Sequence, residues 1–167
     1  MRQTDLVIDR MGAWFHGRRL PCAIGRGGIA RDKREGDGAT PAGVHGIVGM
    51  LYRPDRIAAA ALPDWAVPIG PSDLWSDDPR DEDYNLMVRA PHRWSHERLR
   101  RPDPLYDLVL LTDWNWPQAE PGRGSAIFLH RWRAPRRGTA GCIAFAPRDL
   151  LWIAWRIRHS TRVIVRG

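Results

Sequence analysis

The sequence predicts a mainly β domain, with a barrel-like or sandwich sheet and one helix close to the C-terminus. Gly and Pro number 16 and 14 among the 167 residues, a content that favours many turns and short strands. Short apolar runs bounded by turn residues recur along the chain. A helical repeat of apolar residues marks residues 146–159. The length suits one domain with its own core, and we expect residues 1–167 to form it.

The N-terminal third predicts strands. Residues 5–28 contain two short strands joined through the turn-like stretch 15–19. Cys22 lies in the second of these strands, where we interpret it as a small buried hydrophobic residue. Residues 43–52 predict one further strand, with glycines where the chain bends or packs closely.

Residues 54–104 are rich in Pro, Asp and Trp and predict a long irregular segment, with a short helix at residues 95–100. A segment of this kind inside a compact domain usually has a task such as lining a cleft. Its polar residues beside turns are therefore candidates for substrate contacts, although solvated loops and structural ion pairs explain such residues more often. These candidates are Tyr84, Asn85, His96, Glu97 and Arg98.

The C-terminal part predicts three strands, a helix and a last strand. The strands lie within residues 106–114, 125–132 and 141–146, and the first two flank a loop with two prolines and two glycines. The helix follows at residues 146–159. Pro147 and Asp149 suit its first turn, and basic residues suit its end. Residues 161–167 alternate as a closing strand.

Composition narrows the classes of function. The net charge is +7 and Lys33 is the single lysine, so the charge is almost entirely arginine, which grips carboxylates in a bidentate manner. The cationic surface suits a polyanion, or arginine simply replaces lysine throughout. The arginines are dispersed and form no RNA-binding motif, so we expect no nucleic-acid partner. No apolar run is long enough to span a bilayer, and residues 1–10 do not resemble a secretory signal.

Cys142 is the first candidate for chemistry. A lone cysteine in an apolar run is usually a core residue. Here, however, Gly141 precedes it and permits a tight turn, and residues 136–141 would expose the thiol at the end of a loop. The backbone amides at this turn could then form an oxyanion hole. The two cysteines predict neither a disulfide framework nor a zinc site.

His130 is the natural base for such a thiol, because a nearby imidazole helps to form the thiolate. Two adjacent strands joined by residues 131–141 could place His130 and Cys142 side by side. Trp132, two positions further along the same strand, is a candidate for the cleft wall. Spacing alone does not rank His130 above the other histidines, which are His16, His45, His92, His96 and His159.

These residues give the chain a resemblance, from about residue 5 to residue 166, to the YkuD family of L,D-transpeptidase catalytic domains. That family has a histidine at a strand end, a spacer, and then Ser/Thr-His-Gly-Cys followed by an aliphatic residue and Arg or Asn. His130 and the run of Thr139, Gly141, Cys142 and Ile143 fit the pattern, and Thr40, Pro41 and Gly43 match the Thr-Pro-x-Gly element upstream of it. The chain departs at Ala140, where the family has histidine, and at Ala144, where it has Arg or Asn.

The resemblance implies a mechanism that uses no metal and no cofactor. Cys142, activated by His130, would attack the carbonyl of an L-configured residue in a peptidoglycan stem peptide. The thioester would pass to an amine of a second stem, giving a cross-link, and the departures at Ala140 and Ala144 suggest an unusual type of cross-link. Backbone amides near Ala140 and Gly141 would hold the oxyanion, and Thr139 would help to line the substrate site. The stem peptide would be the partner of a monomeric enzyme, and a periplasmic location follows from that substrate alone.

Two alternatives stay open. Water in place of the amine would make the protein a cysteine-dependent L,D-carboxypeptidase or endopeptidase. In a different class, a basic β domain would bind a polyanion and Cys142 would only pack. Thiol reactivity separates the classes, because a core thiol stays inert until unfolding.

Overall fold

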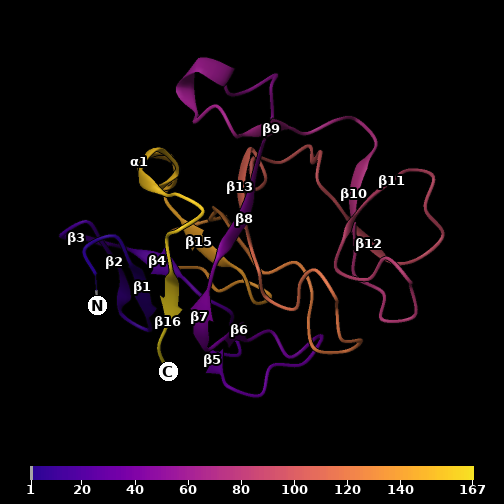
Figure 1. The fold of residues 1–167 in the computed structure, drawn as a ribbon, viewed down its shortest axis with the longest axis horizontal. Coiled ribbons are helices and arrows are strands. Elements are labelled where there is room, and N and C mark those ends of the chain that lie inside the picture. The colour runs from indigo at the N-terminus through magenta and orange to yellow at the C-terminus, as the bar shows by residue number, and fades with distance from the viewer. Residues whose placement is uncertain (1) are drawn as a thin grey trace.

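The computed structural model describes residues 2–167 and confirms a mainly β fold with one helix before the last strand (Figure 1). The first sheet has five strands in the order β3-β2-β1-β16-β7. The first and last parts of the chain pair in it, since β1 and β16 run parallel. Its strands are β1 (Leu6–Asp9), β2 (Gly12–Phe15), β3 (Arg18–Leu20), β7 (Gly43–His45) and β16 (Val163–Val165).

The second sheet is central to the molecule and has the order β4-β15-β14-β13-β8-β9. Its middle strands are nearly all buried, as their apolar sequences predict. Strands β14 and β15 run parallel, and this pairing fixes the candidate site described below. The strands are β4 (Cys22–Ala23), β8 (Ile47–Tyr52), β9 (Val67–Pro68), β13 (Leu108–Thr112), β14 (Phe128–Arg131) and β15 (Ile143–Phe145).

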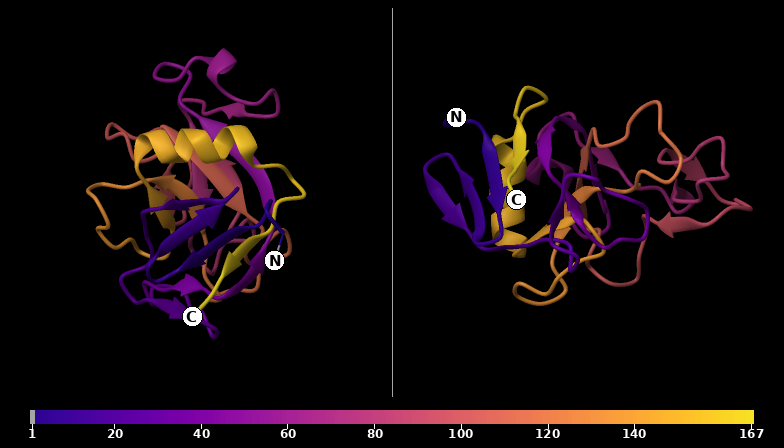
Figure 2. Two further views of the ribbon diagram at one scale, coloured as in Figure 1. Left: turned by 90° about the vertical axis from the view of Figure 1, so that its left-hand side faces the viewer. Right: turned by 90° about the horizontal axis from the view of Figure 1, so that it is seen from below.

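Helix α1 (Pro147–Arg156) lies between these two sheets (Figure 2). Pro147 occupies its first turn, with Asp149 there and Arg156 in the last turn, which agrees with the sequence prediction. Leu150, Ile153 and Ala154 bury the helix against a core to which both sheets contribute. This first core fills one face of the six-stranded sheet.

A second, smaller core covers the other face of the six-stranded sheet. Successive side chains of a strand point to opposite faces, so Leu108 and Leu110 enter the first core while Val109 and Leu111 enter the second. Phe128 joins this second core from β14, and Trp75 packs edge-on against it at 5.0 Å between ring centroids. The candidate site lies on this face.

The segment 54–104 supplies the cover of the second core. It holds the 3-10 helix η1 (Ala59–Ala61) and a three-stranded sheet of order β11-β10-β12, set to one side of the molecule (Figure 1). The sheet consists of β10 (Asp73–Ser76), β11 (Met87–Arg89) and β12 (His96–Arg98). The predicted helix at residues 95–100 is therefore wrong, because pairing of this stretch with β10 overrides its local helical preference.

Residues 43–52 form two strands rather than the one predicted. Strand β7 belongs to the five-stranded sheet and β8 to the six-stranded sheet, so the chain changes sheets at Gly46. A Cβ atom at Gly46 would lie 2.9 Å from Asp113 Oδ2, so a larger residue at this corner would displace the Asp113 side chain. The short strands β5 (Ile29–Ala30) and β6 (Thr40–Pro41) pair beside it. Within residues 2–167, no helix has the length and apolar character to cross a bilayer.

Candidate active site

The parallel pairing of β14 and β15 brings His130 and Cys142 to the same face of the six-stranded sheet. Leu129 and Ile143 are register partners, and both point into the first core. Their neighbours His130 and Cys142 therefore point to the opposite face, where Cys142 packs partly against the second core. The sequence expectation that the connection 131–141 brings the two residues together thus has a structural basis.

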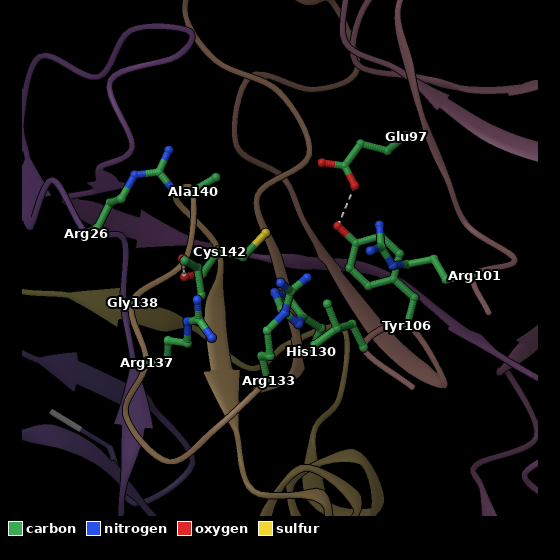
Figure 3. A pocket seen from close by; sticks show the side chains of 12 residues that line it. Arg26, Glu97, Arg101, Tyr106, His130, Arg133, Arg137, Gly138, Ala140 and Cys142 are labelled. Atoms are coloured by element: carbon green, nitrogen blue, oxygen red, sulfur yellow. Dashed lines mark hydrogen bonds between the residues drawn. The ribbon is translucent and has the colours of Figure 1, made fainter. Parts of the chain in front are cut away.

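Both side chains line one cavity of about 320 Å³ (Figure 3). One wall comes from the connection between β14 and β15, and the other comes from β12 and the segment that leads into β13. The lining residues are Arg26, Glu97, Arg101, Leu105, Tyr106, His130, Arg133, Arg137, Gly138, Thr139, Ala140 and Cys142.

His130 is held in one orientation and one tautomer. Its Nδ1 lies 2.7 Å from the carbonyl oxygen of Arg131. Because a carbonyl only accepts hydrogen bonds, Nδ1 carries the proton and Nε2 keeps a free lone pair. Burial against the edge of the Tyr106 ring lowers the pKa of His130 to about 4, so the imidazole is neutral at physiological pH. This is the form that a general base needs.

The Cys142 thiol is also neutral at rest. Its Sγ donates to the carbonyl of Ala126 at 3.0 Å, and the amide of Phe128 donates to it at 3.4 Å. Burial raises the pKa of the thiol to about 12, the amide of Phe128 opposes this shift, and the charge of Glu97 adds to it. The resting site therefore holds a thiol and an imidazole, not a thiolate–imidazolium pair.

The turn before Cys142 is constrained by its backbone. Gly141 has a φ of 144°, and a Cβ atom there would lie 2.9 Å from the carbonyl oxygen of Ala39, so the position requires glycine. Thr139 Oγ1 donates to the Cys142 carbonyl at 2.6 Å and accepts from the Gly141 amide at 3.1 Å. The amides of Ala140 and Cys142 donate to no group within the part of the chain that is described, which leaves both free for a ligand.

Thr40 supports the same turn from the other side. Its hydroxyl donates to the Gly141 carbonyl at 2.8 Å and accepts from the Gly25 amide at 2.8 Å, and the residue is fully buried. The element formed by Thr40, Pro41 and Gly43 is therefore a brace for the segment that carries Cys142.

Replacing Thr40 with valine tests this brace. Valine has nearly the same shape but leaves a buried carbonyl and a buried amide without partners, so we expect the free energy of unfolding to fall by about 2–4 kcal/mol. Urea denaturation measures the loss. Thr161→Val is the matched control, since this buried hydroxyl accepts a single bond, from the amide of Arg158. An equal loss in both variants would contradict the proposed brace.

The neutral thiol makes a second prediction. Only the thiolate is alkylated, so the rate at which iodoacetamide modifies Cys142 should rise about tenfold per pH unit between about pH 7 and 10. Cys22, which is 8% exposed and whose pKa burial also raises to about 12, should react far more slowly because the reagent cannot reach it.

Peptide mass spectrometry follows both cysteines in one sample. Glu97→Gln should speed the alkylation of Cys142, because it removes a negative charge that raises the pKa of the thiol. A rate that stays level from about pH 6 to 9 would show a preformed thiolate and refute the neutral resting state.

Only some of the other predicted site residues line the cavity. Thr139 and Ala140 line the cavity. Tyr84 and Asn85 are buried and do not line it. The Tyr84 hydroxyl donates to Glu35, and the Asn85 amide group donates to the carbonyls of Trp114 and Asn115.

Asn85 nevertheless influences the site indirectly, through Ala126. Its Oδ1 accepts from the amide of Ala126 at 2.9 Å, and the carbonyl of Ala126 accepts the thiol proton of Cys142. Ala126 has a φ of 51°, a backbone conformation that a non-glycine residue adopts only when its surroundings hold it there. Asn85 is therefore a residue that positions the thiol's partner rather than one that touches a ligand in the cavity.

Successive side chains of strand β12 point to opposite faces of its sheet, so the three candidates in this strand do not all reach the cavity. Glu97 faces the cavity, where its carboxylate accepts the Tyr106 hydroxyl at 2.6 Å. His96 and Arg98 point the other way and line a different pocket, formed with residues of β10 and of the segment after β11. Trp132 is half-buried and is not among the residues lining the cavity, because β14 ends at Arg131 and its alternation stops there.

Several lining residues had no sequence signal. Tyr106 opens a predicted strand but is buried between Glu97 and His130, where burial raises its pKa well above the ordinary value. The four lining arginines, which are Arg26, Arg101, Arg133 and Arg137, are indistinguishable in sequence from the others. Within residues 2–167, no cluster of three or more His, Cys, Asp and Glu side chains is arranged to hold a metal ion.

Comparison with known proteins gives one family. The family model described as YkuD, L,D-transpeptidase catalytic domain, matches residues 6–165. Among solved structures, an L,D-transpeptidase from Mycobacterium smegmatis aligns with 14% sequence identity and a TM-score of 0.43, covering 97% of this chain and 58% of that one. The chain thus spans little more than half the length of that structure. No curated protein matches the chain.

Proposed function

This chain belongs to the YkuD family of L,D-transpeptidase catalytic domains, and we propose that it is a cysteine acyltransferase that acts on peptidoglycan stem peptides. The proposed donor is a stem peptide cut at the carbonyl of an L-configured residue. The proposed acceptor is an amine of a second stem. This substrate would locate the reaction in the periplasm.

One observation carries the proposal. The Cys142 thiol and the imidazole of His130, with Nε2 unprotonated and without a partner in the described chain, line a single cavity. A nucleophile and a base of this kind need to share one substrate-sized space, and a cavity of about 320 Å³ accommodates the reacting part of a peptide.

The geometry supports the following acylation step. Nε2 of His130 takes the thiol proton, directly or through one water, as Sγ of Cys142 attacks the donor carbonyl. The free amides of Ala140 and Cys142 are the donors that can hold the oxygen as it becomes negative. When the tetrahedral intermediate collapses, the carbon–nitrogen bond breaks. The imidazolium then returns its proton to the leaving amine, and a thioester remains on Cys142.

Deacylation reverses these roles. The incoming amine attacks the thioester carbonyl, Nε2 of His130 accepts a proton from it, and the thiol leaves with a proton. Glu97 is the one acidic residue that lines the cavity, and its charge attracts an ammonium group before that group loses its proton. Water in place of the amine would give hydrolysis with the same residues, so the acceptor decides between transferase and hydrolase.

The test is incubation of purified muropeptides with the protein, followed by mass spectrometry. We expect new cross-linked dimers, and fragmentation identifies the bond that was made. Shortened monomers without dimers would make the protein a hydrolase. Unchanged muropeptides, with tri-, tetra- and pentapeptide stems all supplied, would refute the enzymatic proposal and favour a polyanion-binding domain.

A further inference from the structure

We propose that Arg26, Arg133 and Arg137, here called the arginine rim, bind a free carboxylate of the acyl donor and make the site selective against donors in which that carboxylate is amidated. This inference rests on the proposed function and deepens it, since it specifies the charge state of the substrate.

The arginine rim is built onto the segment that carries the nucleophile. Arg133 and Arg137 lie in the connection between β14 and β15, which starts just after His130 and ends just before Cys142. Arg26 comes from the chain after β4, and its amide donates to the Thr139 carbonyl at 2.9 Å. Gly138 packs against it so closely that a Cβ atom would lie 3.2 Å from the Cα of Arg26. All three side chains line the cavity, Arg26 and Arg137 on one side and Arg133 next to His130 (Figure 3).

The arginine rim forms no ion pair within the described chain, although the charge of Arg133 helps to lower the pKa of Asp103, the partner of Arg101. Among residues 2–167, no carboxylate forms an ion pair with Arg26, Arg133 or Arg137, and no hydrogen bond of their side chains is found. Arg101, the fourth lining arginine, is different. It binds Asp103 in a bidentate manner at 2.9 and 2.7 Å and stacks over the Tyr106 ring. Arg101 therefore supports the wall, and the rim keeps its charge for a ligand.

The cavity has an acidic residue on one side and arginines on the other. Figure 3 shows Glu97 and Tyr106 on one side, Arg26 and Arg137 on the other, and the Cys142 sulfur between them. Guanidinium groups without an ion-pair partner that line the same cavity as a nucleophile suit a carboxylate, which accepts two parallel N–H bonds from one guanidinium group. The donor would then lie with its acidic group toward the rim, and the side of Glu97 would stay open for the amine.

The residue at position 144 is a further reason to assign carboxylate binding to the arginine rim. Ala144, where the family pattern has Arg or Asn, is fully buried between β14 and β4 and offers no charge. Ala144 does not line the cavity, whereas the rim supplies positive charge to it from other elements. Because its members lie on loops rather than on a strand, sequence pattern alone does not reveal them.

A matched pair of donors tests the inference. One is a tetrapeptide stem with free side-chain and terminal carboxylates, and the other is the same peptide with these groups amidated. The wild-type protein should have a KM about 10- to 100-fold lower for the free acid, the range expected for hydrogen bonds between charged groups. Arg133→Gln and Arg137→Gln should each remove much of this preference by raising KM, with kcat nearly unchanged.

Arg136→Gln is the control, because Arg136 is the exposed neighbour of Arg137 and does not line the cavity. It should leave both donors unaffected. The inference is overturned if the wild type uses both donors equally, or if the rim variants weaken both donors by the same factor.

Calorimetry with Cys142→Ala separates this inference from the proposed function, because binding needs no turnover. If the wild type transfers neither donor but the free acid still binds Cys142→Ala more tightly than the amide, the proposed function fails and the rim stands. If donors are transferred but bind with equal affinity, the function stands and the rim fails. Displacement of the donor by inorganic phosphate, but not by acetate of equal ionic strength, would also overturn the carboxylate assignment.

Discussion

Replacing Cys142 with alanine is expected to remove both transfer and hydrolysis, with a loss of about a thousandfold or more in kcat/KM. The reason is that each proposed bond change passes through a thioester on this sulfur, and the rest of the cavity has no second nucleophile of equal strength. Turnover of a defined tetrapeptide stem, followed by liquid chromatography, measures the effect.

Cys22→Ala is the matched control for this result. Cys22 is the other cysteine of the chain, it is buried in β4, and it does not line the cavity. Its replacement should leave kcat/KM within a few fold of the wild type after allowance for any loss of stability. Activity that survives in Cys142→Ala but falls in Cys22→Ala would reverse the assignment of the nucleophile.

Replacing His130 with glutamine is expected to slow acylation by about 10²- to 10⁴-fold, the usual contribution of a positioned general base. Glutamine keeps the approximate size and can still donate to the Arg131 carbonyl, but it cannot accept the thiol proton. The pH profile is the diagnostic readout. Between about pH 6 and 9 the wild-type kcat/KM should be level, because the imidazole pKa is about 4 and the thiol pKa about 12.

In His130→Gln only the thiolate attacks, so kcat/KM should rise about tenfold per pH unit over the same range. A level profile in the variant would show that His130 is not the base. Rates measured near pH 10 should therefore recover toward those of the wild type, which a merely unfolded variant would not do.

The same substitution predicts a change in acid stability. Burial depresses the pKa of His130 from 6.5 to about 4, so the unfolded chain binds more protons than the folded one between these values. Keeping His130 neutral therefore costs the folded state nothing above pH 6.5. As the pH falls from 6.5 to 4, the free energy of unfolding should decrease by up to about 3 kcal/mol. Urea denaturation should show a shallower loss for His130→Gln. Some loss should remain, since burial also lowers the pKa of His45.

The sequence predicts the fold correctly in those segments whose residue pattern is compatible with only one secondary structure. The apolar runs of β13, β14 and β15 have little choice but a buried sheet, and Pro147 with Asp149 marks the start of α1. The prediction for residues 95–100 was wrong because their pattern is compatible with more than one secondary structure. Their alternation of charged residues fits a helix end or a strand, and pairing with β10, distant in sequence, decides between them.

The candidate site was predictable to the same degree. His130 and Cys142 follow from two strand ends and a connection of fixed length, so local sequence contains enough information to pair them. Glu97 reaches the cavity from β12, a strand that the sequence prediction missed, whereas Tyr106 comes from the segment just before β13. Because alternation assigns Glu97 to one face and His96 with Arg98 to the other, an error in the secondary structure became an error in the site. Arg26 joins through a backbone bond to Thr139 that no sequence pattern announces.

The most direct test of the account is the mass of the intact protein after rapid quenching in acid during turnover of a tetrapeptide stem. We predict an added mass equal to the donor minus its leaving residue, located by peptide mapping on Cys142 and released by hydroxylamine, as a thioester requires. The adduct should be absent from Cys142→Ala and should accumulate when no amine acceptor is supplied. Product formation without an adduct on Cys142, or an adduct on another residue, would contradict the central role assigned to this thiol.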